Sequence, residues 1–143
     1  MKCKFVVSGP PVGYTATTTR GKWNADFQKY ANYAKFVRAC ALRAGIKLPL
    51  FASEKKPLII KTIAYFPNRR HCDPGNVQKG ICDALFYDEF GINDVPAKKR
   101  RSRKGNDKFT GGSFPPPRYD KKNPRVIVII KSYKMKEEKN ASC

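Results

Sequence analysis

The sequence predicts a small α/β (α+β) domain, in which two main helices pack on a small mixed β-sheet. Apolar patterns along the 143-residue chain follow the order strand, helix, strand, helix, basic loop, strand. Segments in this order form a sheet that is covered by helices. The chain is 41% hydrophobic, too apolar for a disordered tail, and its length suits one modest core. We therefore expect one domain over residues 1–135, with a basic loop at about 95–123 and a charged tail over 136–143.

Three segments rich in β-branched and aromatic residues are predicted to be strands. They cover residues 2–8, 57–66 and 125–133. The first is ended by Gly9-Pro10-Pro11, because glycine and proline interrupt regular structure. One or two further short strands are expected between residues 93 and 112.

Two segments have the spacing of helices. In residues 24–44, apolar side chains recur every three or four positions, with Asn24 as the expected N-cap and Gly45 as the C-cap. The second helix is expected to start at Asp73-Pro74, because aspartate is a favoured N-cap and proline is favoured in the first helical position. Its buried stripe is formed by Val77, Ile81, Ala84 and Leu85, and it ends before Gly91.

The net charge points to a polyanionic partner. Thirty Lys and Arg residues stand against eleven Asp and Glu residues, which gives a formal charge of +19. A folded domain with this excess repels itself unless a polyanion shares the field, and nucleic acid is the usual one. No basic amphipathic helix with a bulky apolar face favours a membrane surface instead. We expect no organic cofactor.

The start of the chain and its cysteines favour a cytoplasmic protein. No signal peptide is expected, because the first apolar run ends at Gly9, and the other apolar runs are only as long as strands. The five cysteines are scattered, and in a reducing compartment we expect free thiols. A zinc site at His71, Cys72 and Cys82 is disfavoured because no paired ligand spacing is present.

The second predicted helix carries a polar face beside its apolar stripe. Helical spacing puts Asp73, Asn76, Lys79 and Asp83 on that face, and Asp94 follows the helix beyond a turn at Gly91. Carboxylates repel a phosphodiester unless a cation intervenes, and Mg²⁺ binds one or two carboxylates together with substrate phosphate. We therefore expect Mg²⁺, with Mn²⁺ as a possible substitute, at Asp73 and Asp94.

The same residues also have simpler explanations. Asp73 would cap the helix, Asp83 would pair with Lys79 one turn away, and Asp94 would be a turn residue. In a strongly basic protein, however, carboxylates on a nucleic-acid-binding surface weaken affinity unless they hold a metal.

The segment from Arg69 to Asp94 resembles the signature of the RusA family of Holliday junction endonucleases. The sequence around it reads Arg69-Arg-His-Cys-Asp-Pro-Gly-Asn-Val-Gln-Lys-Gly-Ile-Cys-Asp-Ala-Leu85. Family members have Asp-x-Asp-Asn-x-x-Lys, then Asp-Ala/Gly-Leu, then an Asp-Asp pair. The matching residues here are Asp73, Asn76, Lys79, Asp83 and Asp94.

This resemblance implies a homodimer that uses Mg²⁺ to cut four-way DNA junctions in recombination and repair, in phages, prophages or bacteria. It gives catalytic roles to Asp73, Lys79, Asp83 and Asp94. Two positions depart from the signature: Gly75 stands for its second aspartate and Asn93 for the first residue of the Asp-Asp pair. The alternative is therefore a junction- or nucleic-acid-binding protein with weakened or absent catalysis. An RNA-binding protein of ribosomal type is a third reading.

Basic and aromatic residues outside the helix are expected to contact DNA. Six of the seven residues from 98 to 104 are cationic, and we assign phosphate contacts to Arg69, Arg70 and Asn76 as well. The cations of the basic run are Lys98, Lys99, Arg100, Arg101, Arg103 and Lys104. Tyr14, Phe109 and Phe114 are candidates for stacking on exposed bases at a branch point.

Overall fold

A computed structural model describes residues 2–15, 25–86 and 110–133 of the chain. It contains a mixed five-stranded sheet and two helices, which confirms the predicted α+β class. The elements are β1 (Lys2–Ser8), α1 (Ala25–Arg43), β2 (Leu58–Phe66), α2 (Pro74–Phe86), β3 (Thr110–Ser113), β4 (Arg118–Tyr119) and β5 (Arg125–Ser132).

The three predicted strands form the centre of the sheet. Its order is β1-β5-β2-β3, and β4 pairs with β2 beyond the end of β3. β5 lies antiparallel between β1 and β2, whereas β3 and β4 run parallel to β2. β5 is the last strand among the described residues, and it pairs with strands on both sides, so the sheet is complete only when the C-terminal part of the domain is in place.

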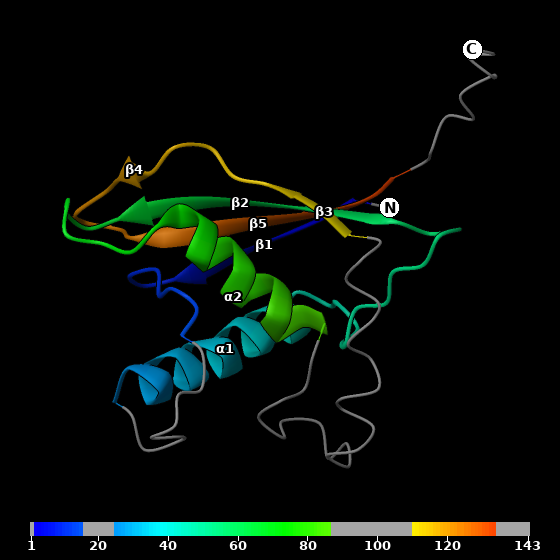
Figure 1. Cartoon of the computed structure of the whole chain (residues 1–143), viewed down its shortest axis with the longest axis horizontal. Helices are drawn as coiled ribbons and strands as arrows, with labels where there is room; N and C mark the ends of the chain where they lie inside the picture. The colour runs from blue at the N-terminus through cyan, green and yellow to red at the C-terminus, as the bar shows by residue number, and fades with distance from the viewer. Residues whose placement is uncertain (1, 16–24, 87–109, 134–143) are drawn as a thin grey trace.

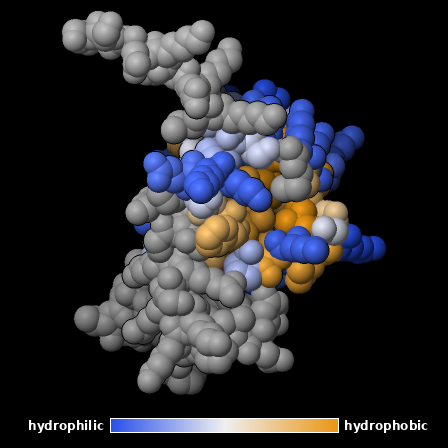
Figure 2. All heavy atoms as spheres, turned by 90° about the vertical axis from the view of Figure 1, so that its right-hand side faces the viewer, coloured by the Kyte–Doolittle hydropathy of each residue, from blue (hydrophilic) through white to orange (hydrophobic). Residues whose placement is uncertain are grey.

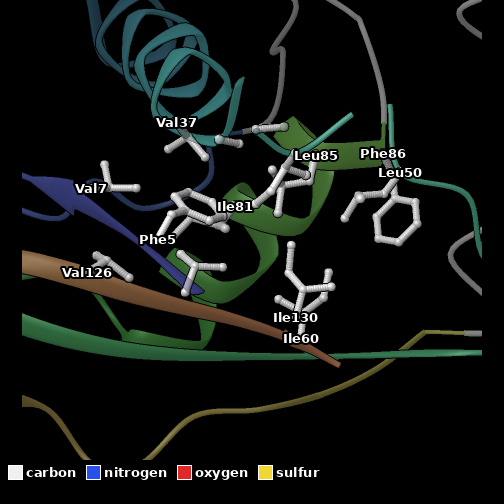
Figure 3. Close-up of a cluster of buried hydrophobic side chains, with 14 of the residues drawn as sticks. Phe5, Val7, Val37, Leu50, Ile60, Ile81, Leu85, Phe86, Val126 and Ile130 are labelled. Carbon is white, nitrogen blue, oxygen red and sulfur yellow. The ribbon is translucent and has the colours of Figure 1, made fainter. Parts of the chain in front are cut away.

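Both helices pack on the same face of this sheet (Figure 1). We call it the covered face, and its side chains include Phe5, Val7, Ile60, Val126 and Ile130, all fully or almost fully buried. Val37 of α1 and Ile81 and Leu85 of α2 meet them in the core (Figure 3). The predicted stripe of α2 is thus the side that packs.

Two polar side chains are buried between α2 and β2. The Thr62 hydroxyl donates a hydrogen bond to Gln78 Oε1, and Gln78 Nε2 donates to the Ile60 carbonyl at 3.0 Å. A Cβ atom at Gly112 of β3 would lie 2.1 Å from Gln78 Nε2. Any residue larger than glycine at this position would therefore displace the Gln78 side chain. The Gln78 side chain therefore fixes how α2 sits over β2 and β3.

The helices are also joined by a buried arginine. Arg38 of α1 is fully buried, and its guanidinium donates to the Ala84 carbonyl in the last turn of α2. A cation near a helix C-terminus interacts favourably with the helix dipole. Sequence reasoning did not identify this residue, because an arginine on a helix surface usually faces water.

The observed boundaries follow the sequence closely where it has strong patterns. β1 has the predicted bounds, and the other two long strands begin or end within one residue of them. α1 begins at Ala25, and the expected cap Asn24 lies outside the described residues. β3 starts at Thr110, inside the expected region, but β4 lies after it and was not predicted. A strand of two exposed residues has no apolar alternation to reveal it.

The two ends of the sheet differ in character. At the end where β2 begins, apolar surface gathers between hydrophilic side chains (Figure 2). Tyr133, which is 48% exposed, lies at this end, because its amide donates to the carbonyl of Pro57, the residue before β2. α2 begins at the opposite end, close to where β2 stops (Figure 1). In the part of the chain that the structure describes, no helix is long and apolar enough to cross a membrane.

Candidate functional site

The candidate site begins with Asp73, the residue before α2. Its Oδ1 accepts a hydrogen bond of 2.8 Å from the Gly75 amide, and its carbonyl accepts from the Asn76 amide at 3.0 Å. Asp73 is therefore the N-cap, as the sequence predicted. The carboxylate remains exposed at the positive end of the helix dipole, where negative charge is stabilised.

Gly75 lies under an aromatic ring. A Cβ atom built on Gly75 would lie 3.3 Å from Asp73 Oδ1 and 3.2 Å from the Cζ atom of Phe114. A side chain at this position would thus start directly beside the Asp73 carboxylate. Phe114, which is 48% exposed, packs against this position.

Asn76 and Lys79 are exposed on the same side of α2, in its first and second turns. The Lys79 ammonium lies 4.2 Å from the centroid of the Tyr14 ring, a cation–π contact. Tyr14 is held there because its amide donates to the Asn76 carbonyl at 3.0 Å and its ring packs edge-on against Tyr30. The segment after β1 therefore orients the Lys79 ammonium, and the Tyr14 ring packs internally.

The segment after β1 can approach α2 closely because residue 80 of this helix is a glycine. A Cβ atom at Gly80 would lie 2.9 Å from the Tyr30 ring and 3.4 Å from the Tyr14 amide nitrogen. Gly80 thus lets α1 and the chain after β1 pack against the middle of α2. Glycine costs about 1 kcal/mol of helix propensity relative to alanine, and this packing offsets it.

The loop between β2 and α2 forms the border of the site. Arg69 and Arg70 are exposed, and the Arg69 guanidinium lies 5.8 Å from the centroid of the Tyr119 ring. His71 stacks on Phe66, with ring centroids 3.9 Å apart. His71 Nδ1 donates to the Cys72 carbonyl at 2.7 Å, and His71 Nε2 is hydrogen-bonded to the Tyr119 hydroxyl at 2.9 Å.

Tyr119 is an aromatic residue of the site that sequence reasoning missed. It lies in β4, it is 48% exposed, and its bond to His71 ties β4 to the loop before α2. Tyr119 pairs with Phe66 at the end of β2, and the Arg69 guanidinium lies beside its ring. In the sequence, only the Arg118-Tyr119 pair after three prolines points to this residue, and that pattern is weak on its own.

Several predicted site residues are separate from Asp73 or lie outside the described part. Asp83 is half-buried and ten residues along the chain from Asp73, about 15 Å at the helical rise, so the two carboxylates do not meet. Asp94, Phe109 and all six cations of residues 98–104 fall outside the described residues.

Donor groups for a metal ion are few around Asp73 in the described residues. Among residues 2–15, 25–86 and 110–133, no group of three or more His, Cys, Asp or Glu side chains is gathered as for a metal ion. One exposed carboxylate, Asp73, nevertheless fits Mg²⁺, which binds few protein ligands and keeps several waters. Asp94 would be the second ligand from this chain.

The four cysteines that the structure describes, Cys3, Cys40, Cys72 and Cys82, are free thiols, as expected. Burial raises the pKa of the Cys72 thiol, and it does the same for Cys40. A raised pKa keeps the thiol protonated at neutral pH. Both nitrogens of His71, the other candidate for zinc, are engaged in the hydrogen bonds described above.

A scan against models of known protein families finds no match, and a search of curated proteins finds none either.

Proposed function

We propose that the protein is a metal-dependent endonuclease that cuts branched DNA, with four-way junctions as its substrate, in the manner of the RusA family. One observation carries the proposal: an exposed carboxylate at the start of α2 stands among exposed Asn76, Lys79, Arg69 and Arg70 in a chain of net charge +19. A carboxylate at the centre of a phosphate-binding surface repels DNA unless it binds a cation, so its presence there favours a metal site.

Each residue has a task in this proposal. Asp73 and Asp94 would hold Mg²⁺ or Mn²⁺, which supplies an activated water and polarises the phosphoryl oxygen. The Lys79 ammonium, kept in position by the Tyr14 ring, offsets negative charge that develops on the phosphate. Arg69, Arg70 and Asn76 hold the phosphates on either side, and Asp83 supports the polar face of α2.

A homodimer would present two such sites to a symmetric junction, so that paired cuts release two duplexes. Such an enzyme would act in the cytoplasm, on cellular or phage DNA, during recombination and repair. The basic run over residues 98–104 would contact a junction arm.

Asp73 offers a substitution that separates its two roles. Asparagine caps helices as well as aspartate does, whereas alanine does not. We expect Asp73→Asn to fold like the parent and to bind junctions, but to leave cleavage at the level of a metal-free control. Asp73→Ala should lose cleavage and, in addition, about 1 kcal/mol of stability in thermal or urea unfolding.

The assay uses a synthetic four-way junction, with a linear duplex as control, over a series of Mg²⁺ and Mn²⁺ concentrations and pH. Asp94→Asn should behave as Asp73→Asn does, and Lys79→Ala should slow cleavage by about 10²–10³-fold. Normal cutting by Asp73→Asn would show that the site assignment is wrong. Absence of nicking by the parent protein at every metal concentration would argue against the enzyme.

The second candidate function is a junction-binding protein without catalysis. Gly75 and Phe114 favour it, because an aromatic ring lies where a second carboxylate would extend from α2. The Cβ atom of Gly75→Asp would lie 3.3 Å from Asp73 Oδ1 and 3.2 Å from Phe114 Cζ, so the new side chain would start beside both groups. The informative pair is therefore Gly75→Asp with and without Phe114→Ala, and Phe114→Ala alone is the control.

If the parent is inactive and the double variant cuts junctions, the site has lost a ligand that the fold still accommodates. If neither variant cuts and both bind junctions tightly, the protein is a binding module. Preference for RNA over branched DNA in a competition assay would instead support the ribosomal type of function.

A further inference from the structure

The strands carry an unusual distribution of charge on the face of the sheet opposite the helices. We call it the open face, and its side chains alternate with the buried ones along each strand. The five strands contain no Asp or Glu but six cations, and all six belong to the open face. They are Lys2, Lys4, Lys61, Arg118, Arg125 and Lys131.

The pairing register arranges these cations in rows across the sheet. Lys4 and Lys61 flank Ile129 in one row, and in the next row Lys2 lies opposite Lys131. Lys131 is a diagonal neighbour of both Lys4 and Lys61, so the four lysines form one cluster around Ile129. Like charges directly opposite each other in a sheet are destabilising, so the cluster has a cost in the free protein.

A second group of cations lies at the other end of the open face. Tyr65 stands between two arginines: the Arg125 guanidinium is 3.9 Å from its ring centroid, and Arg118 donates to its hydroxyl at 3.1 Å. Arg125 also pairs with Asp120 at 2.9 Å. Between the two groups runs an apolar row in which Ile127 is flanked by Val6 and Ile63.

The length and the positive charge of the open face favour a DNA duplex as its partner. Arg125 and Lys131 are six residues apart in β5, about 20 Å at the rise of a strand. That length spans about six base-pair steps of a duplex. A second copy of the chain would oppose lysine to lysine. Stacked bases are also disfavoured, because the Tyr65 ring is already in contact with Arg125.

We propose that the open face binds the sugar–phosphate backbone of double-stranded DNA, as a surface separate from the candidate site at the start of α2. The lysine cluster and the Arg118–Tyr65–Arg125 group contact phosphates, and the aliphatic row between them lies against the sugars. Such contacts hold DNA without reading its sequence. This inference does not depend on cleavage, because it concerns binding by residues outside the metal site.

The test compares two triple variants with the same loss of charge. Lys4→Gln/Lys61→Gln/Lys131→Gln changes the open face, and Lys35→Gln/Lys47→Gln/Lys55→Gln changes exposed lysines outside the sheet. Affinity for a 20-base-pair duplex is measured without divalent cations over a salt series. Each phosphate contact contributes about 0.9 to the slope of log K against log salt, so we expect the open-face variant to lower its magnitude by about 2 to 3. The control should lower it by less than about 1.

Chemical acetylation of the parent protein gives a second measurement that requires no variant. Duplex DNA should protect Lys4, Lys61 and Lys131 and leave Lys35, Lys47 and Lys55 reactive, as read by peptide mass spectrometry. Equal slopes for the two triple variants, or equal reactivity of the two lysine sets with DNA, would overturn the proposal. Protection of the open face by poly-glutamate as strong as by DNA would overturn it in favour of an acidic protein partner.

A failure of DNA binding by the open face can be distinguished from a failure of the proposed nuclease activity. The open-face triple variant should weaken metal-free binding whether or not the parent protein cuts junctions, since none of its three lysines belongs to the candidate site. A protein that binds through the open face but never cuts would keep this inference and lose the nuclease.

Discussion

The two faces of the sheet use the same strands for opposite purposes. On the covered face, every second side chain is apolar and buried under α1 and α2, and the few polar groups, such as Thr62 and Gln78, are bonded to each other. On the open face, one row is wholly aliphatic, the neighbouring rows carry cations beside residues such as Ile129 and Tyr65, and none of the five strands contributes a carboxylate. The covered face therefore supports folding, whereas the charge of the open face is explained by a partner outside the chain. Adjacent residues of one strand allow this contrast to be tested.

The largest difference is expected within β5. Ile130 is 1% exposed in the core, and its neighbour Ile129 points to the open face. Ile130→Ala should destabilise the fold by about 2–5 kcal/mol, because it leaves a cavity. Ile129→Ala should cost less than about 1.5 kcal/mol, since the residue is already partly in contact with water. Urea unfolding measures both, and equal losses would show that the open face is packed as tightly as the covered one.

A smaller difference is expected within β3. A Cβ atom at Gly112 would collide with Gln78 Nε2, whereas one at Gly111, on the open face, would meet Ile59 at an ordinary 3.8 Å. Gly112→Ala should cost about 1–3 kcal/mol, because Gln78 must leave its buried hydrogen bonds to Ile60 and Thr62. Gly111→Ala should be close to neutral. Thermal unfolding of the pair tests this, and a neutral Gly112→Ala would contradict the role given to Gln78.

The smallest effect concerns Asp120, beside the open face. Hydrogen bonds from the Asn123 amide and from the Arg125 side chain lower the pKa of this exposed carboxyl. A lowered folded pKa stabilises the fold above the ordinary value of about 4, and the contribution is lost as pH falls below it. Asp120→Asn should therefore flatten a slight decline in stability below about pH 4. An unchanged acid profile would mean that these bonds do not matter in solution.

The main elements could be predicted because their patterns are local. Alternation along residues 2–8, helical spacing in residues 77–85 and the Asp-Pro start of α2 each depend on near neighbours in the chain. The exposure of Asp73, Asn76 and Lys79 followed from the same helical geometry. By contrast, β4, buried Arg38 and the His71–Tyr119 bond join residues far apart in sequence, and no local pattern reveals such partners.

The sequence by itself determined the fold class, the excess of positive charge and the polar face of α2, because composition and periodicity survive in any arrangement of the chain. Only the tertiary structure decided which cations share a surface. Lys4, Lys61 and Lys131 come from three strands distant in sequence, and the antiparallel register around β5 brings them together. It likewise decided that Phe114 lies over Gly75, because that contact requires the chain after β3 to return to the start of α2. Pairing and packing between distant segments, which depend on the whole folded chain, fixed both features.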